Sequence, residues 1–224
     1  MKQQMNNYRV SKCLSALLGV LLCVTVSVAA EQEQGPADVV TQAASELQSR
    51  LSGQQEFYAA NTAELYALVD DVLLPNFDVE YAGKLVLGKT HWRAADESQR
   101  ERFIEVFYSF LIKTYAKGVL EFDQDKLLIL PDVSFSKNGS KALVRTELVV
   151  DAGDNVQVNY AVRSVDSGWK IYDVRIEGVS YIQNYRNQFD AEISAQGIEA
   201  VIVRLEQEIE QAKAQNDTAE PQTT

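Results

Sequence analysis

The chain has 224 residues and a formal net charge of −11, with 32 acidic residues against 21 basic ones. This acidity disfavours nucleic acid and non-specific adsorption to anionic lipid headgroups, so protein partners should present basic patches. One histidine and two cysteines are too few for a histidine-rich metal site, and they make thiol chemistry implausible.

The first 30 residues have the order of a cleavable secretory signal. Three basic residues and no acid precede an apolar run over residues 14–28, and small residues follow at Ala29 and Ala30. The run is shorter than the roughly 20 residues that a membrane span needs. We expect cleavage after Ala29 or Ala30 and export to the periplasm. Both cysteines lie in this leader, so the exported chain has no disulfide, and its net charge is −14.

Helical periodicity marks the next two elements. A helix is expected from Pro36 to Gly53, with its apolar residues three and four positions apart. A second is expected from Asn61, which forms a capping box with Glu64, to Pro75. Both present a single apolar face and should pack on a core.

An apolar stretch then runs from Phe77 to Leu87. Gly83 lies within it and Gly88 follows it. The role of these glycines is left open between a mobile gate, a helix end and a turn. Asp96 begins a long helix whose apolar side chains cover most of its circumference. So wide an apolar arc needs more than one neighbour, or a neighbour and a ligand.

After about residue 125 the apolar period changes from helical to alternating. Residues 142–150 and 156–162 each place apolar side chains on one face, and a turn over 151–155 joins them as an antiparallel hairpin. Asn138-Gly139 marks an earlier turn. In the following strand the apolar phase shifts by one residue, which predicts a bulge near Tyr172-Asp173.

Two helices are expected to close the chain, over residues 180–194 and 198–213, before a polar, disordered tail over 214–224. The predicted class is α+β, a curved antiparallel β-sheet with helices packed on its one dry face. We expect residues 31–213 to form one domain.

Catalytic signatures are scarce. The sequence has no Gly-x-Ser-x-Gly elbow, Walker loop or dinucleotide fingerprint, and His91 lies in what reads as an exposed connection. Asp173 is the sharper candidate, because a carboxylate at a bulge in an apolar strand could act as a base with a raised pKa. We favour the simpler interpretation, in which Asp173 accepts backbone N–H bonds and fixes the bulge.

Four segments carry a family resemblance, in matching order and spacing over roughly residues 37–210. They are Tyr-Ala-Gly-Lys-Leu-Val-Leu-Gly at 81–88, Ser-Gln-Arg-Glu-Arg-Phe at 98–103, Tyr-Asp-Val running to Glu-Gly-Val-Ser over 172–180, and Gly-Ile at 197–198. Together they resemble the MlaC family of periplasmic phospholipid-binding proteins, also described as toluene-tolerance or ABC-transporter auxiliary proteins.

The resemblance implies an NTF2-like cone in which a curved sheet and helices enclose an apolar pocket. It also implies a carrier of glycerophospholipid between an outer-membrane lipoprotein complex and an inner-membrane ABC transporter with an MCE-domain ring, in the maintenance of outer-membrane lipid asymmetry. We expect a monomer, no enzyme activity, no metal and no cofactor besides the phospholipid cargo. The alternatives are a cone-fold enzyme acting on a small apolar substrate through Asp173, and a periplasmic adaptor or chaperone without a ligand.

Residues that line such a pocket should be apolar and face the gap between sheet and helices. An ordinary core uses the same residues, and about half of our candidates should touch lipid. The candidates are Phe77, Tyr81, Leu85, Phe103, Phe107, Phe110, Leu111, Tyr115, Val144, Leu148, Val158, Tyr160, Val162, Trp169, Ile171, Val174, Ile176 and Val179.

Overall fold

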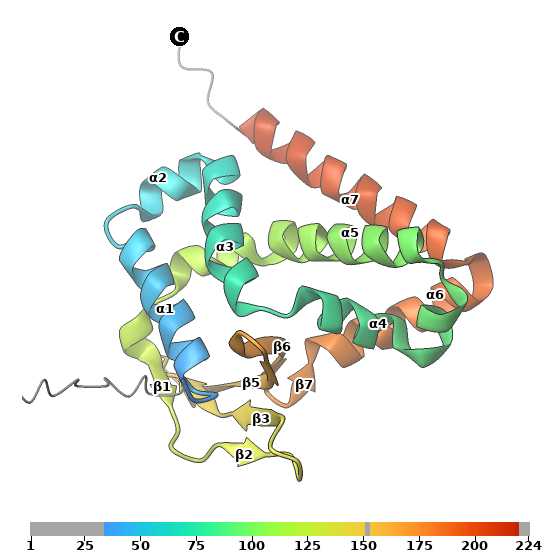
Figure 1. The fold of residues 1–224 in the computed structure, drawn as a ribbon. Helices are drawn as coiled ribbons and strands as arrows, with labels where there is room; N and C mark the ends of the chain where they lie inside the picture. The colour runs from blue at the N-terminus through green and yellow to red at the C-terminus, as the bar shows by residue number, and fades with distance from the viewer. Residues whose placement is uncertain (1–33, 151–152, 220–224) are drawn as a thin grey trace, which may run out of the picture. The chain divides into compact units, whose positions relative to one another are not determined.

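The structure, a computed structural model, describes residues 34–150 and 153–219 (Figure 1). The predicted leader therefore lies outside the described residues. The helices are α1 (Asp38–Leu51), α2 (Gln55–Ala60), α3 (Thr62–Asn76), α4 (Val79–Ala94), α5 (Glu97–Tyr115), α6 (Tyr181–Gln196) and α7 (Ile198–Ala219), and two short 3-10 helices are η1 (Ala116–Glu121) and η2 (Gln124–Lys126). The strands are β1 (Leu127–Ile129), β2 (Ser134–Phe135), β3 (Lys141–Val144), β4 (Thr146–Leu148), β5 (Val156–Val165), β6 (Gly168–Ile176) and β7 (Val179–Ser180).

The strands form one antiparallel sheet in which β5 is central. β3 and β4, separated by Arg145 alone, pair with opposite halves of β5, while β6 pairs along its other edge. The helices α1, α3, α4 and α6 all contact β6. The predicted α+β class is thus confirmed.

The predicted bulge is present on β6. Ala161 of β5 pairs with Asp173, and the next residue of β5 pairs with Ile171, so Tyr172 is the extra residue. The extra residue moves the apolar side chains of β6 from one face to the other. This bulge therefore explains the one-residue shift of the apolar pattern in the sequence, and the prediction is confirmed.

The segment between α3 and α5 differs from the prediction. From Val79 onward, the apolar stretch and the expected connection after it form one helix, α4, which is kinked at Gly88, where φ is 62°, while Phe77 is the C-cap residue of α3. Gly83 is needed inside this helix because a Cβ there would lie 2.8 Å from Ile104 Cγ1 of α5. His91 is not an exposed connection residue: its side chain is 11% exposed, and Nε2 lies 2.8 Å from Asp190 Oδ1 on α6.

The helix ends agree only in part with those expected from the sequence. Asp96 caps α5 in a full capping box with Gln99. The box expected at Asn61 does not form, because the preceding helix α2 offers the Asn61 amide a bond to the Phe57 carbonyl at 2.8 Å. Helix α7 continues to Ala219, past the predicted boundary at residue 213.

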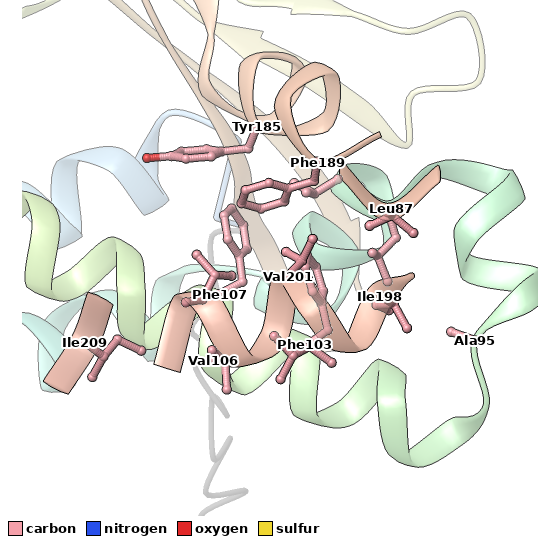
Figure 2. Packing of buried hydrophobic residues seen from close by; sticks show 14 residues of the cluster. Leu87, Ala95, Phe103, Val106, Phe107, Tyr185, Phe189, Ile198, Val201 and Ile209 are labelled. Carbon is pink, nitrogen blue, oxygen red and sulfur yellow. The ribbon is translucent and has the colours of Figure 1, made fainter. Parts of the chain in front are cut away.

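The apolar residues gather in three clusters. The α4–α7 cluster is built on α4, α5, α6 and α7 around Phe103, Phe107 and Phe189, whose rings meet at 5.7–6.0 Å (Figure 2). The α1–α3 cluster joins α1, α3 and the end of α5. The sheet cluster packs Val39 and Val40 of α1 on β3, β5 and β6.

Candidate functional site

A cavity of about 290 Å³ lies where the three clusters meet. One wall comes from α3, α4 and α5, continuing into η1, and the other comes from the bulged half of β6 and the start of α6. The residues that line it are Val69, Leu73, Phe77, Val79, Ala82, Ile104, Phe107, Tyr108, Leu111, Ile112, Tyr115, Ala116, Val119, Tyr172, Asp173, Val174, Ile176, Tyr181, Ile182 and Tyr185.

The lining is apolar and aromatic apart from a few phenol groups and one carboxylate. The hydroxyls of Tyr115 and Tyr185 are 2.8 Å apart, and the ring of Tyr181 meets that of Tyr115 edge to face at 5.3 Å. Burial raises the pKa of both Tyr181 and Tyr185. The phenols of Tyr181 and Tyr185 are therefore neutral at physiological pH, and this part of the cavity offers a long apolar ligand an aromatic surface.

Tyr108 adds a further phenol, on α5. Its hydroxyl is buried and makes no hydrogen bond with any described residue. Burial, together with the charge of nearby Asp70, raises the Tyr108 pKa. The hydroxyl thus stays protonated and contributes no charge to the cavity.

Asp173 contributes the single carboxylate among the lining residues that the structure describes, and its two oxygens are occupied. Oδ2 accepts from the Ser180 hydroxyl at 2.8 Å and from Arg175 Nε at 3.2 Å, while Oδ1 accepts from the Ile182 N–H at 3.2 Å. Ser180 in turn caps α6 by accepting from Gln183 N–H at 3.0 Å. Asp173 therefore ties the bulge in β6 to the first turn of α6, so these contacts give the carboxylate a structural role.

Part of the predicted lining faces this cavity. Helix α5 supplies half of these residues and β6 supplies the pair after the bulge. The predicted residues that line it are Phe77, Phe107, Leu111, Tyr115, Val174 and Ile176. Contact of these side chains with lipid stays a prediction.

The other predicted residues lie elsewhere. Val144, Val162 and Ile171 are buried in the sheet cluster, with Tyr160 and Trp169 packed against it, because Val39 and Val40 of α1 cover that part of the dry face. Phe103 and Phe110 belong to the α4–α7 cluster. Tyr81 and Leu85 line a separate surface pocket, Val179 is 60% exposed, and Leu148 and Val158 are half-buried outside the cavity.

The residues that sequence reasoning missed come mainly from helices. Ile104, Tyr108 and Ile112 form a second apolar face of α5, which extends through Ala116 and Val119 of η1. Their spacing of three or four residues was the available signal. The wide apolar arc of α5 does serve two surroundings, α7 on one side and the cavity on the other.

No helix in the described part of the chain combines the length and apolarity that a bilayer crossing requires. Within residues 34–150 and 153–219, no three His, Cys, Asp or Glu side chains are grouped as a metal site would need.

Comparison with known proteins agrees with this geometry. The phospholipid-binding protein of Ralstonia solanacearum, solved in complex with a phospholipid, has the same fold, with a TM-score of 0.71 at 23% identity, covering 80% of this chain and 99% of that one. The intermembrane phospholipid transport system binding protein MlaC of Haemophilus influenzae is 27% identical over 210 residues, 92% of this chain and 97% of its own length. The toluene tolerance protein ttg2D of Pseudomonas putida is 26% identical over 176 residues, 79% of each chain.

The MlaC protein family matches residues 41–207, which include every helix that lines the cavity and the whole sheet. With the apolar cavity, the bulged sheet and this match over most of its length, the chain belongs to the MlaC family.

Proposed function

We propose that the protein is a periplasmic carrier that holds the acyl chains of a glycerophospholipid in the cavity between α5 and β6. The observation that supports this most is the wall itself, which is apolar and aromatic and whose one carboxylate is bonded to three donors. Such a surface suits alkyl chains and suits no charged substrate. The cargo headgroup stays in water at the mouth of the cavity, so tolerance of different headgroups is expected.

Free diffusion of the cargo is negligible on energetic grounds. Two acyl chains contain on the order of 30 methylenes, and exposing them to water costs about 24 kcal/mol at roughly 0.8 kcal/mol each. An apolar cavity recovers this energy for each methylene that it encloses, without exceeding what a bilayer offers. Carrier and membrane then exchange lipid near balance, and partners must give transport its direction.

The names of the relatives support transport between membranes. In the proposed path the protein, a monomer, moves lipid between an outer-membrane lipoprotein complex and an inner-membrane ABC transporter with an MCE-domain ring. The basic and apolar order of the first 30 residues supports export to the periplasm. The bonded carboxylate of Asp173 supports a carrier over an enzyme that uses this residue as a base.

The proposal is tested by organic extraction of protein purified gently from the periplasm, followed by mass spectrometry of the extract. Phospholipid at about one molecule per protein is expected. An empty protein recovered in high yield would refute the carrier and favour the adaptor without a ligand.

A matched pair of variants places the lipid. Leu111→Trp enlarges a cavity-lining residue, and Leu68→Trp enlarges a residue that is 4% exposed in the α1–α3 cluster. Overpacking a core costs typically 1–3 kcal/mol, whereas a larger side chain in the cavity displaces acyl chain instead. Leu111→Trp should lower lipid content with little effect on the lipid-free protein, and Leu68→Trp should do the reverse. Stability is compared after delipidation, because bound lipid raises the apparent melting temperature.

A further inference from the structure

A second pocket, of about 570 Å³, opens on the surface between α4 and α6 and shares no lining residue with the apolar cavity. Four of its lining residues are cationic: Lys84, Lys89, Arg93 and Arg186. All four are exposed, and none of them forms an ion pair within the described residues. The lining contains no acid among those residues. In a chain of net charge −11, this is a local reversal of sign.

The floor of this basic pocket is built around two fixed features. Arg186 of α6 lies against Gly88, where a Cβ would come within 2.9 Å of its Nη2, so the kink of α4 makes room for the guanidinium. Two cations lie over the ring of Trp92, with Lys84 Nζ at 5.3 Å and Arg100 Cζ at 5.1 Å from its centroid. Arg100 also donates to the Trp92 carbonyl at 2.7 Å. The cations are thus held near one another despite their mutual repulsion.

The neighbouring acids do not neutralise the pocket. Asp78 is paired with Arg163, and Asp190 Oδ1 lies 2.8 Å from His91 Nε2, so neither acid forms an ion pair with a cation of the pocket in the described part of the chain. A further cation extends the positive surface, because Lys141 donates to the hydroxyl of Tyr81, another lining residue. Glu80, one turn before Lys84, makes no ion pair with it in the described structure.

We propose that the basic pocket between α4 and α6 binds a phosphate-bearing group. Lysine provides a point charge and arginine a planar donor fork, the two side chains that proteins use for phosphate. Four positive charges exceed the single charge of a protein carboxylate, whereas a phosphoester offers more acceptor oxygens and up to two charges. Trp92 and Tyr81 are residue types that favour the interface of membrane and water. The phosphate can come from a phospholipid headgroup at a membrane surface or from a soluble phosphoester.

Two probes distinguish these sources, used with the whole purified protein. The first is glycerol 3-phosphate, followed by NMR of the Trp92 indole N–H and the Gly88 amide. The second is sedimentation with vesicles of phosphatidylcholine and phosphatidylglycerol, against vesicles whose negative charge comes from oleate. Saturable shifts with glycerol 3-phosphate identify a site for soluble phosphoesters. Binding to phosphatidylglycerol vesicles alone identifies the headgroup.

The charge-matched variants are Lys89→Gln/Arg186→Gln in the pocket and Lys117→Gln/Lys137→Gln outside it. The pocket pair should weaken binding to the effective probe at least tenfold, and the control pair should leave it within about twofold. Cavity lipid content should be the same in both, which separates this proposal from the carrier function. The proposal fails if neither probe binds, if both pairs weaken binding equally, or if oleate vesicles bind as well as phosphatidylglycerol vesicles. A glutamate-rich peptide is added as a third probe, and binding of this peptide alone would overturn the proposal in favour of a protein partner.

Discussion

Replacement of Asp173 by Asn separates a structural carboxylate from a catalytic one. The side chain is 5% exposed and accepts from Ser180, Ile182 and Arg175. Asn keeps one side-chain oxygen and has an NH2 group in place of the other. Because this NH2 group is a donor and would face a group that also donates, at least one bond to the start of α6 is lost. Bonds to a charged group contribute roughly 1.5–3 kcal/mol each, and a buried unpaired donor costs about 1–3 kcal/mol. We expect the variant to lose about 3 kcal/mol.

For a chain of this length, that loss lowers the melting temperature by about 6–12 °C. The assay is thermal unfolding of delipidated protein by circular dichroism, with extracted phospholipid quantified per folded molecule. The matched control is Asp132→Asn, an exposed loop carboxylate, which should change stability by less than about 0.5 kcal/mol. An unchanged melting temperature with a loss of bound lipid would show that Asp173 acts on the ligand and that its contacts to α6 carry little stability.

Other expectations follow from single positions. Gly88→Ala should destabilise the chain by about 1–3 kcal/mol in urea unfolding, because φ is 62° and the Cβ would meet Arg186, whereas Gly118→Ala, with open space around it, should be near neutral; equal effects would contradict the strained kink. Burial raises the pKa of Tyr160 to about 12 and also raises that of Tyr185, so their contribution to stability is complete below about pH 10 and is lost as the pH rises through the folded-state values. Melting temperatures between about pH 8 and 12 should therefore fall less steeply for Tyr160→Phe than for the unmodified protein, and parallel curves would refute this.

The sequence predicts those parts of the fold that depend on the spacing of apolar and polar residues along the chain. The bulge at Tyr172 appears as a shift in apolar phase, and the cap at Asp96 appears as a spaced pair of polar residues. Helix α4 was missed because two glycines in an apolar stretch resemble breaks. One of them, Gly83, is present for close packing on α5, which is a property of the partner and leaves no local pattern.

The cavity was only partly predictable for the same reason. Periodicity indicates that Val144 and Val162 face inward. It does not indicate whether they pack against another element or line a cavity, because that depends on which element faces them. There, α1 brings Val39 and Val40 onto the sheet. On the helical wall, the spacing of Ile104 and Tyr108 was visible in the sequence. It gave no reason to assign this face of α5 to the cavity rather than the neighbouring apolar face.

The meeting of three apolar clusters at one cavity links cargo to protein turnover. Phe107 belongs to the α4–α7 cluster, Val69 to the α1–α3 cluster, and Val174 packs on the sheet cluster, yet all three line the same cavity. A lipid in that space joins the clusters into one cooperative unit, whereas in the empty protein each can open at its own lower free energy. Proteases cleave such partly opened chains, so empty molecules should be degraded first and the lifetime of the protein should follow the supply of lipid.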